Sequence, residues 1–152
     1  MTYLNVDSDG RIKLDELTDS IRDDTVLISV IAVNSETGVI QDLEKIGNII
    51  KQKNKNVYFH SDFVQGLGHI KINPAKCRLD ALTVSSHKVY GPKGAGAIYL
   101  SGNVKIKPLI FGSSYSFCSS SMLVLFTLSM VLLYHETVPM CRRCEMHLCL
   151  LH

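Results

Sequence analysis

The sequence predicts an α/β domain with a mostly parallel sheet over residues 1–110, followed by an apolar tail over 111–152. Short apolar runs alternate with amphipathic segments of helical period, which indicates strand–helix–strand units. Polar residues follow three of the apolar runs directly. Most of the 16 basic and 14 acidic residues precede residue 108. The charged residues beyond it are Glu136, Arg142, Arg143 and Glu145.

The first helix and the first strand are predicted from apolar spacing. Leu14, Leu17 and Ile21 recur at helical spacing among acidic residues, which predicts a short amphipathic helix over 13–22. The segment 26–33 is almost entirely apolar and rich in β-branched residues. Such a run is typical of a strand that is covered on both faces, as in a parallel sheet.

A second helix is predicted after Asp42, whose side chain can cap a helix N-terminus. Leu43, Ile46, Ile49 and Ile50 would form its apolar face. Strand, helix and strand in this order predict parallel pairing with crossover connections. The further strands are expected over 57–60, 79–84 and 97–100.

Functional side chains are expected where these strands end. Asn34 follows the first strand, Asp62 the second, and 85–88 (Ser-Ser-His-Lys) the third. In open α/β sheets, ligands bind just beyond the carboxyl ends of the strands. The sequence therefore predicts one site that combines an amide, a carboxylate, a hydroxyl, an imidazole and an amine.

This set of groups matches the needs of pyridoxal 5'-phosphate (PLP). A lysine desolvated at a strand end, here Lys88, can lose its proton and form a Schiff base. A carboxylate such as Asp62 can pair with the pyridine nitrogen of the cofactor. Each residue also has a structural interpretation: Lys88 as a surface lysine, Asp62 as a turn or cap residue, and His87 as a loop histidine.

Three blocks of sequence carry a resemblance to a known family. They are Asn-Ser-Glu-Thr-Gly-Val from Asn34, His-Ser-Asp-Phe-Val-Gln from His60, and Ser-Ser-His-Lys-Val-Tyr-Gly-Pro-Lys-Gly from Ser85. In order and spacing they resemble the signatures of cysteine desulfurases, PLP enzymes of the class V aminotransferase family. The resemblance covers residues 2–110 and implies part of a PLP-transferase fold type I large domain.

The resemblance implies a role for each residue at the strand ends. Lys88 would be the catalytic lysine that bonds to the cofactor and moves protons. Asp62 would pair with the ring nitrogen, and Gln65 would hydrogen-bond to the ring hydroxyl.

The same resemblance implies the remaining cofactor contacts. Ser85 and His87 would hold the phosphate. Asn34 would lie near the ring hydroxyl and the substrate carboxylate.

The implied reaction converts L-cysteine to alanine and leaves a persulfide on an enzyme cysteine. The family supplies this sulfur to iron–sulfur scaffold proteins and to transfer RNA thiolation, and its intact members are homodimers. A selenocysteine lyase or another class V enzyme is the alternative enzyme. A catalytically inactive remnant is the alternative that is not an enzyme.

The chain also departs from the family pattern. The upstream half of the large domain and the persulfide loop are missing, so none of the five cysteines is assigned the persulfide role. Phe63 replaces a small residue and is expected to compete with the cofactor ring for space. We therefore expect an incomplete, inactive fragment, from a truncated or frameshifted gene, with unpaired sheet edges, poor solubility and little PLP binding.

Composition excludes several other classes. The net charge of +2 and the absence of Trp argue against nucleic-acid binding. No targeting signal opens the chain, so a cytoplasmic or mitochondrial location and a free, buried Cys77 are expected.

The tail admits two further interpretations. Its apolar run over 119–134 is marginal for a membrane helix, which needs about 20 residues. It could also form a helix that is buried, or an aggregation-prone segment. A zinc site is not expected, because its candidate ligands are crowded near the C-terminus: Cys141, Cys144, His147, Cys149 and His152.

Overall fold

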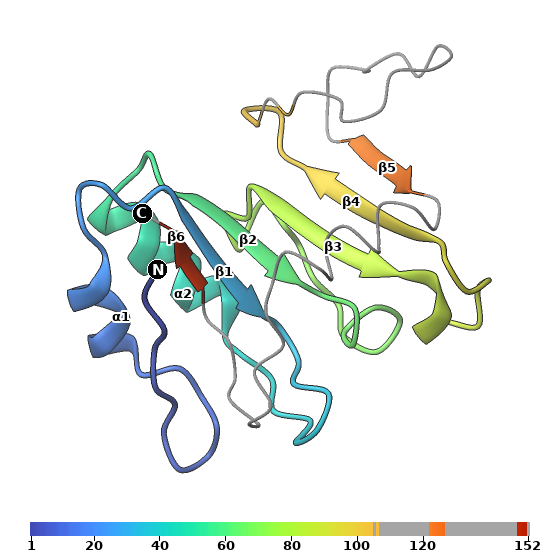
Figure 1. The fold of residues 1–152 in the computed structure, drawn as a ribbon, viewed down its shortest axis with the longest axis horizontal. Coiled ribbons are helices and arrows are strands. Elements are labelled where there is room, and N and C mark those ends of the chain that lie inside the picture. Colours follow the sequence, from blue (N-terminus) through green and yellow to red (C-terminus); the bar gives the residue numbers. More distant parts are fainter. Residues whose placement is uncertain (105, 107–121, 127–148, 152) are drawn as a thin grey trace.

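The computed structural model describes residues 1–104, 106, 122–126 and 149–151. A single six-stranded sheet has the order β5-β4-β3-β2-β1-β6 (Figure 1). Among the described residues, two α-helices and one 3₁₀ helix accompany it: α1 (Leu14–Ser20), α2 (Leu43–Lys53) and η1 (Ser86–Lys88). The strands are β1 (Leu27–Ile31), β2 (Tyr58–Asp62), β3 (Ala81–Ser85), β4 (Gly96–Leu100), β5 (Met122–Phe126) and β6 (Cys149–Leu151).

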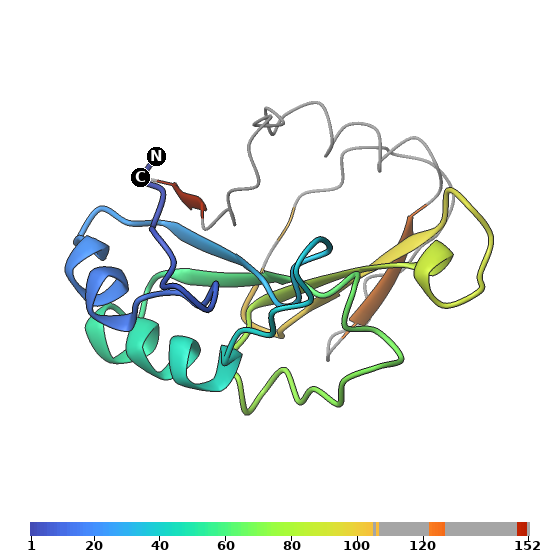
Figure 2. The same ribbon diagram turned by 90° about the horizontal axis from the view of Figure 1, so that it is seen from below.

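Both α-helices cover the same face of the sheet, and the hydrophobic core lies beneath them (Figure 2). On the face below the helices, β1 and β2 carry apolar side chains that are fully or almost fully buried, among them Ile28, Val30 and Phe59. They share the core cluster with Leu17 of α1 and Ile46 of α2. The apolar helix faces predicted from residue spacing are therefore the faces that cover the sheet.

The predicted α/β class with a mostly parallel sheet is confirmed. Strand β1 pairs with β2 in parallel, and α2 makes the connection between them. Strand β2 pairs with β3 in parallel, whereas β3 pairs with β4 in antiparallel orientation. Strands β1, β2 and β3 therefore run in the same direction, and their carboxyl ends lie side by side. The candidate site residues are expected at these ends.

The element bounds differ slightly from the predicted ones. Asp62 and Ser85 are the last residues of β2 and β3, one or two residues beyond the predicted strand ends. The predicted N-cap is confirmed, because the Asp42 side chain accepts a hydrogen bond from the Lys45 backbone N–H at 3.1 Å. Cys77 is free and buried, as expected.

The tail contributes to both edges of the sheet. Strand β5 pairs with β4, and β6 pairs with β1, both in antiparallel orientation. The expectation of unpaired edges on β1 and β4 is therefore wrong. Met122–Phe126 is a strand in place of the suggested helix, and the rest of 119–134 lies outside the described residues.

The membrane and zinc interpretations of the tail concern mostly residues outside the described ranges. Within those ranges, no helix is both long enough and apolar enough to cross a membrane. The described residues also contain no cluster of three or more His, Cys, Asp or Glu that could hold a metal ion. The potential zinc ligands outside the described residues are Cys141, Cys144, His147 and His152.

Candidate functional site at the carboxyl ends of the strands

Asp62 lies at the carboxyl end of β2 and is half-buried. Its Oδ1 accepts a hydrogen bond from the Val64 backbone N–H at 2.9 Å. Burial raises the pKa of the Asp62 carboxyl, and the bond from Val64 opposes this effect only in part. A carboxylate that burial destabilises in this way gains stability from a nearby positive charge, such as a protonated ring nitrogen.

Ser85 and His87 lie at the end of the neighbouring strand, β3, and contact each other. The Ser85 Oγ is 2.6 Å from the His87 Nδ1. Ser85 is half-buried and His87 is exposed. The pair presents a hydroxyl and an imidazole at one strand end, which suits hydrogen bonding to phosphate oxygens.

Lys88 is the last residue of the short 3₁₀ helix η1 and is exposed. The expectation of a lysine desolvated at the strand end is therefore not met within the described residues.

Asn34 follows β1 and is half-buried. Its Oδ1 accepts hydrogen bonds from the Glu36 N–H, the Thr37 N–H and the Thr37 Oγ1, at 2.9, 2.9 and 3.1 Å. The carboxamide oxygen is thus used within its own turn. Asn34 can therefore serve a ligand through its Nδ2 donor, which suits an anionic oxygen.

The pairing of β2 with β3 sets how these groups lie. Asp62 and Thr83 are Cα partners, and the Phe63 N–H donates to the Thr83 carbonyl at 2.9 Å. Because side chains alternate along a strand, Asp62, Thr83 and Ser85 share one face of the sheet. Gln65 is half-buried in the turn that follows β2. The structure thus brings Asp62 and Ser85 to adjacent strand ends, and Lys88 follows Ser85 by one helical turn.

Ser86 is a structural residue of the site; the sequence analysis placed it after the third strand but missed its role. Its Oγ donates to the Pro92 and Ala95 carbonyls, the latter at 2.9 Å. Its own carbonyl accepts the N–H groups of Val89 and Gly91 at 3.0 and 2.9 Å. Ser86 therefore closes the loop that carries Lys88. A serine between a strand and a loop rich in Gly and Pro was the available signal.

His60 is a second missed residue, and it lies two positions before Asp62 on the same face of β2. It is 6% exposed and contacts Ser29 of β1 and Thr83 of β3. Burial lowers the pKa of the His60 imidazole to about 4, so the ring is neutral near pH 7. The sequence feature that could have revealed this role is the presence of polar residues, such as Ser29 and His60, inside otherwise apolar strands.

The structure corrects the expectation that Phe63 competes with the cofactor ring. The Phe63 side chain is 3% exposed and belongs to the hydrophobic core cluster. Phe63 follows Asp62, the last residue of β2, and its N–H donates to the Thr83 carbonyl, so it continues the strand and its side chain points away from that of Asp62. A Cβ on Gly66 would lie 2.7 Å from the Phe63 Cε2 and Cζ, so this glycine leaves the space that the phenyl ring fills.

We expect Gly66→Ala to lower the free energy of unfolding by about 1–3 kcal/mol, because the added methyl group overpacks the Phe63 ring. Chemical denaturation would measure the change. The matched control is Gly102→Ala, since a Cβ there would meet no atom within 4 Å. Combining Gly66→Ala with Phe63→Leu should recover part of the loss. Equal effects of Gly66→Ala and Gly102→Ala would contradict the packing argument.

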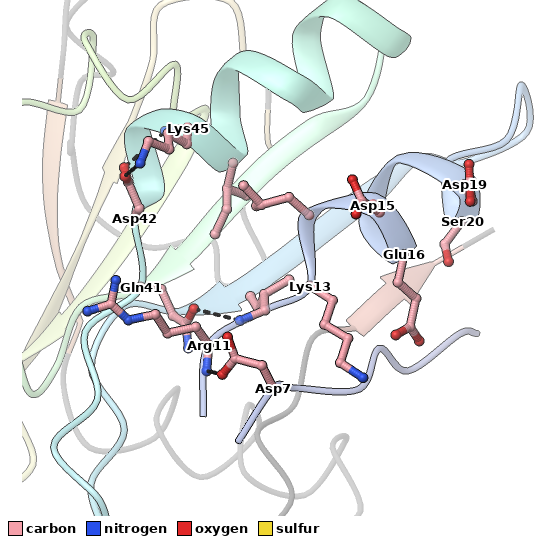
Figure 3. A pocket seen from close by; sticks show the side chains of 13 residues that line it. Asp7, Arg11, Lys13, Asp15, Glu16, Asp19, Ser20, Gln41, Asp42 and Lys45 are labelled. Atoms are coloured by element: carbon pink, nitrogen blue, oxygen red, sulfur yellow. Dashed lines mark hydrogen bonds and ion pairs between the residues drawn. The ribbon is translucent and has the colours of Figure 1, made fainter. Parts of the chain in front are cut away.

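Two hollows in the described part of the chain lie away from Asp62 and Lys88. One, of about 740 Å³, lies between the N-terminal segment, α1 and the start of α2 (Figure 3). Its charged side chains have both signs, and Gln41 crosses it to accept the Ile12 N–H at 3.0 Å. The other, of about 620 Å³, is lined in part by the Lys51–Asp80 ion pair. Neither hollow is lined by the predicted site residues.

Curated proteins with similar sequences include several that are named cysteine desulfurases. The "Cysteine desulfurase IscS" of Rickettsia prowazekii (strain Madrid E) is 49% identical over 114 residues, covering 74% of this chain and 27% of that protein. The "Cysteine desulfurase, mitochondrial" of Saccharomyces cerevisiae is 52% identical over 114 residues, 74% of this chain and 22% of that protein. The chain therefore spans about a quarter of the length of these relatives.

Solved structures agree in fold. A NifS-like protein superposes with a TM-score of 0.70 at 43% identity, covering 74% of this chain and 31% of the other. A structure described as SspA in complex with cysteine gives a TM-score of 0.67 at 38% identity, with coverage of 74% and 32%.

The family model for class V aminotransferases matches residues 1–128. This match extends past residue 110, where the change in composition predicts a boundary. With most of its residues matched and its fold shared with NifS-like structures, the chain belongs to the class V aminotransferase family.

Proposed function

We propose that the chain is part of the large domain of a PLP-dependent cysteine desulfurase. The observation that carries the proposal is that three of the predicted site residues lie close together in the fold, at the carboxyl ends of β2 and β3. Asp62 and Ser85 end adjacent parallel strands on one face, and Lys88 lies on the single helical turn that follows. Relatives named cysteine desulfurases, 49% and 52% identical, support the same reaction class.

The donor and acceptor groups at this edge fit PLP. The cofactor, when bound, supplies an electron sink for carbanion chemistry at an amino acid. Asp62 would hold a proton on the ring nitrogen, and the raised pKa of its buried carboxyl would be offset by the positive charge that it gains. Gln65, in the turn after β2, would donate to the ring hydroxyl.

The remaining residues would orient the two ends of the ligand. Ser85 and His87, already 2.6 Å apart, would bind the phosphate oxygens together. The Nδ2 group of Asn34 would donate to the substrate carboxylate, since its Oδ1 is held in the turn. Lys88 would bind the cofactor covalently and move the proton at the substrate Cα.

The substrate in this proposal is L-cysteine, and alanine is the product. A persulfide would form on an enzyme cysteine that is none of the five in this chain. Its sulfur would then pass to sulfur acceptors or iron–sulfur scaffold proteins. A homodimer and a cytoplasmic or mitochondrial location belong to the same proposal. We expect the chain alone to release no alanine from cysteine, because Lys88 is exposed and the chain spans only about a quarter of the length of its relatives.

Trapping of PLP on lysine tests the proposal directly. The 152-residue chain is incubated with excess PLP, reduced with borohydride, digested and mapped by mass spectrometry. We expect weak labelling overall, with Lys88 labelled at least about tenfold more than any other lysine. The reason is that, under the proposal, Asp62, Ser85 and His87 would hold the ring and phosphate near that amine.

Lys93→Ala provides the matched control, because Lys93 is exposed in the same loop. It should leave labelling at Lys88 unchanged, whereas Asp62→Asn should reduce it. Labelling spread evenly over the surface lysines would refute the proposed site. Tight, Lys88-dependent binding with a strong visible absorbance band would instead refute the expected weakness of the isolated chain.

A further inference from the structure

Three polar side chains form a hydrogen-bonded bridge across β1, β2 and β3. The Ser29 Oγ lies 2.7 Å from the His60 Nδ1, and the His60 Nε2 lies 3.1 Å from the Thr83 Oγ1. Ser29 and His60 are Cα partners in the β1–β2 pairing. The bridge therefore joins three strands through side chains, in addition to their backbone hydrogen bonds.

This bridge lies on the face of the sheet that carries the candidate site. His60 and Asp62 are two residues apart on β2 and so point to the same face. Thr83, the far end of the bridge, is the Cα partner of Asp62. The Thr83 carbonyl also accepts the Phe63 N–H at 2.9 Å, so Thr83 is bonded to the peptide that directly follows Asp62.

The imidazole suits a bridging role because it is neutral and buried. A neutral ring has one donor and one acceptor nitrogen, and each hydroxyl can take the complementary part. Such a bridge gives both ring nitrogens a partner in either tautomer and restricts the rotation of the Thr83 hydroxyl. The carboxyl ends of β2 and β3, which present Asp62 and Ser85, are held in register by the same contact.

Resting on the proposed function, we propose that His60 is a positioning residue of the cofactor site. Through Thr83 it fixes Asp62 against the Ser85–Lys88 segment, at the spacing that a bound ring requires. It touches neither cofactor nor substrate in this role. Its effect is on where the Asp62 carboxylate lies.

Amide hydrogen exchange on the full chain tests this inference without any cofactor. Thr83→Val removes the hydroxyl and keeps the side-chain shape. We expect exchange at the Phe63 and Val64 amides to rise at least about tenfold, while the Ile46 amide in α2 stays at the parent rate. Thr83→Ser keeps the hydroxyl and should restore slow exchange.

The matched control is Thr18→Val, which removes a part-buried threonine hydroxyl that donates to the Leu14 carbonyl in α1. It should leave Phe63 and Val64 unchanged. Ser29→Ala removes the other end of the bridge, and it should produce a smaller increase at the same two amides. This milder variant serves if Thr83→Val fails to fold.

Two results would overturn the inference. Unchanged exchange at Phe63 and Val64 would show that the bridge positions nothing, and equal acceleration of all amides would show a general structural role. Borohydride trapping at Lys88 is measured in parallel and should fall in Thr83→Val. Failure of trapping in the parent chain would count against the proposed function, whereas the exchange rates would still test the role of His60 independently.

Discussion

Replacing Asp80 with Asn is expected to lower the free energy of unfolding by about 3–5 kcal/mol, because it leaves a buried lysine charge without its partner. The Lys51 Nζ lies 2.6 Å from the Asp80 Oδ2, and the two side chains are only 16% and 14% exposed. The same Asp80 oxygen accepts the Phe59 N–H at 2.8 Å, and the Lys51 ammonium also donates to the Val57 carbonyl at 2.7 Å. The pair thus joins α2 to the starts of β2 and β3.

Denaturant unfolding of the parent chain and Asp80→Asn would measure the loss. The matched control is Glu44→Gln, which breaks the Lys76–Glu44 pair at 2.9 Å, where both side chains are well exposed. Solvent screens such a pair, so we expect little change. The double variant Lys51→Met with Asp80→Asn should be more stable than Asp80→Asn alone, because no unpaired charge remains. Similar losses from Glu44→Gln and Asp80→Asn would contradict the argument.

The Lys51–Asp80 pair also shows which contacts the sequence could not supply. Its members are 29 residues apart, and nothing in local spacing links them. The Ser29–His60 and His60–Thr83 contacts are separated by 31 and 23 residues and were missed for the same reason. By contrast, the Asp42 cap and the apolar faces of the helices depend on residues three or four apart, and these were predicted correctly.

Phe63 is a different case, because its placement depends on where β2 ends: the sequence predicts an end at residue 60, whereas the strand runs to Asp62. The Phe63 N–H still bonds to the Thr83 carbonyl, so Phe63 continues the strand and its side chain points away from that of Asp62. The structure accordingly places the phenyl ring in the core, where Gly66 provides the space. The motif comparison showed that Phe63 replaces a small residue of the family. The alternation of side chains along a strand decides on which face of the sheet the phenyl ring lies.

The exposure of Lys88 has another cause. Its place after β3 was predicted, but its solvent exposure depends on what covers the strand ends. The chain spans 27% of the Rickettsia prowazekii relative, so most of that relative's residues have no counterpart here. Local sequence can name the residues of such a site, whereas excluding water from it takes contacts from distant segments.

Acidification from pH 6.5 to about 4 is expected to remove about 3 kcal/mol of the His60 contribution to stability. In the unfolded chain the imidazole takes up a proton below about pH 6.5, but in the folded chain it does so only near pH 4. Between these values the unfolded state binds one more proton, so stability rises with pH. The contribution is complete above pH 6.5, falls as the pH decreases, and is constant below about 4.

Unfolding free energies of the parent and His60→Gln, measured from pH 7 to pH 4, isolate this contribution. Burial also raises the pKa of Asp62, which gives an opposite slope above the ordinary aspartate range. Asp62 is present in both proteins, so its effect cancels in the difference between them. The difference should shrink steadily as the pH falls, and His69→Gln, at an exposed position, should keep the parent's pH dependence. A difference that is independent of pH would mean that the imidazole takes up its proton equally in the folded and unfolded chains, and a ring held neutral between Ser29 and Thr83 would then be untenable.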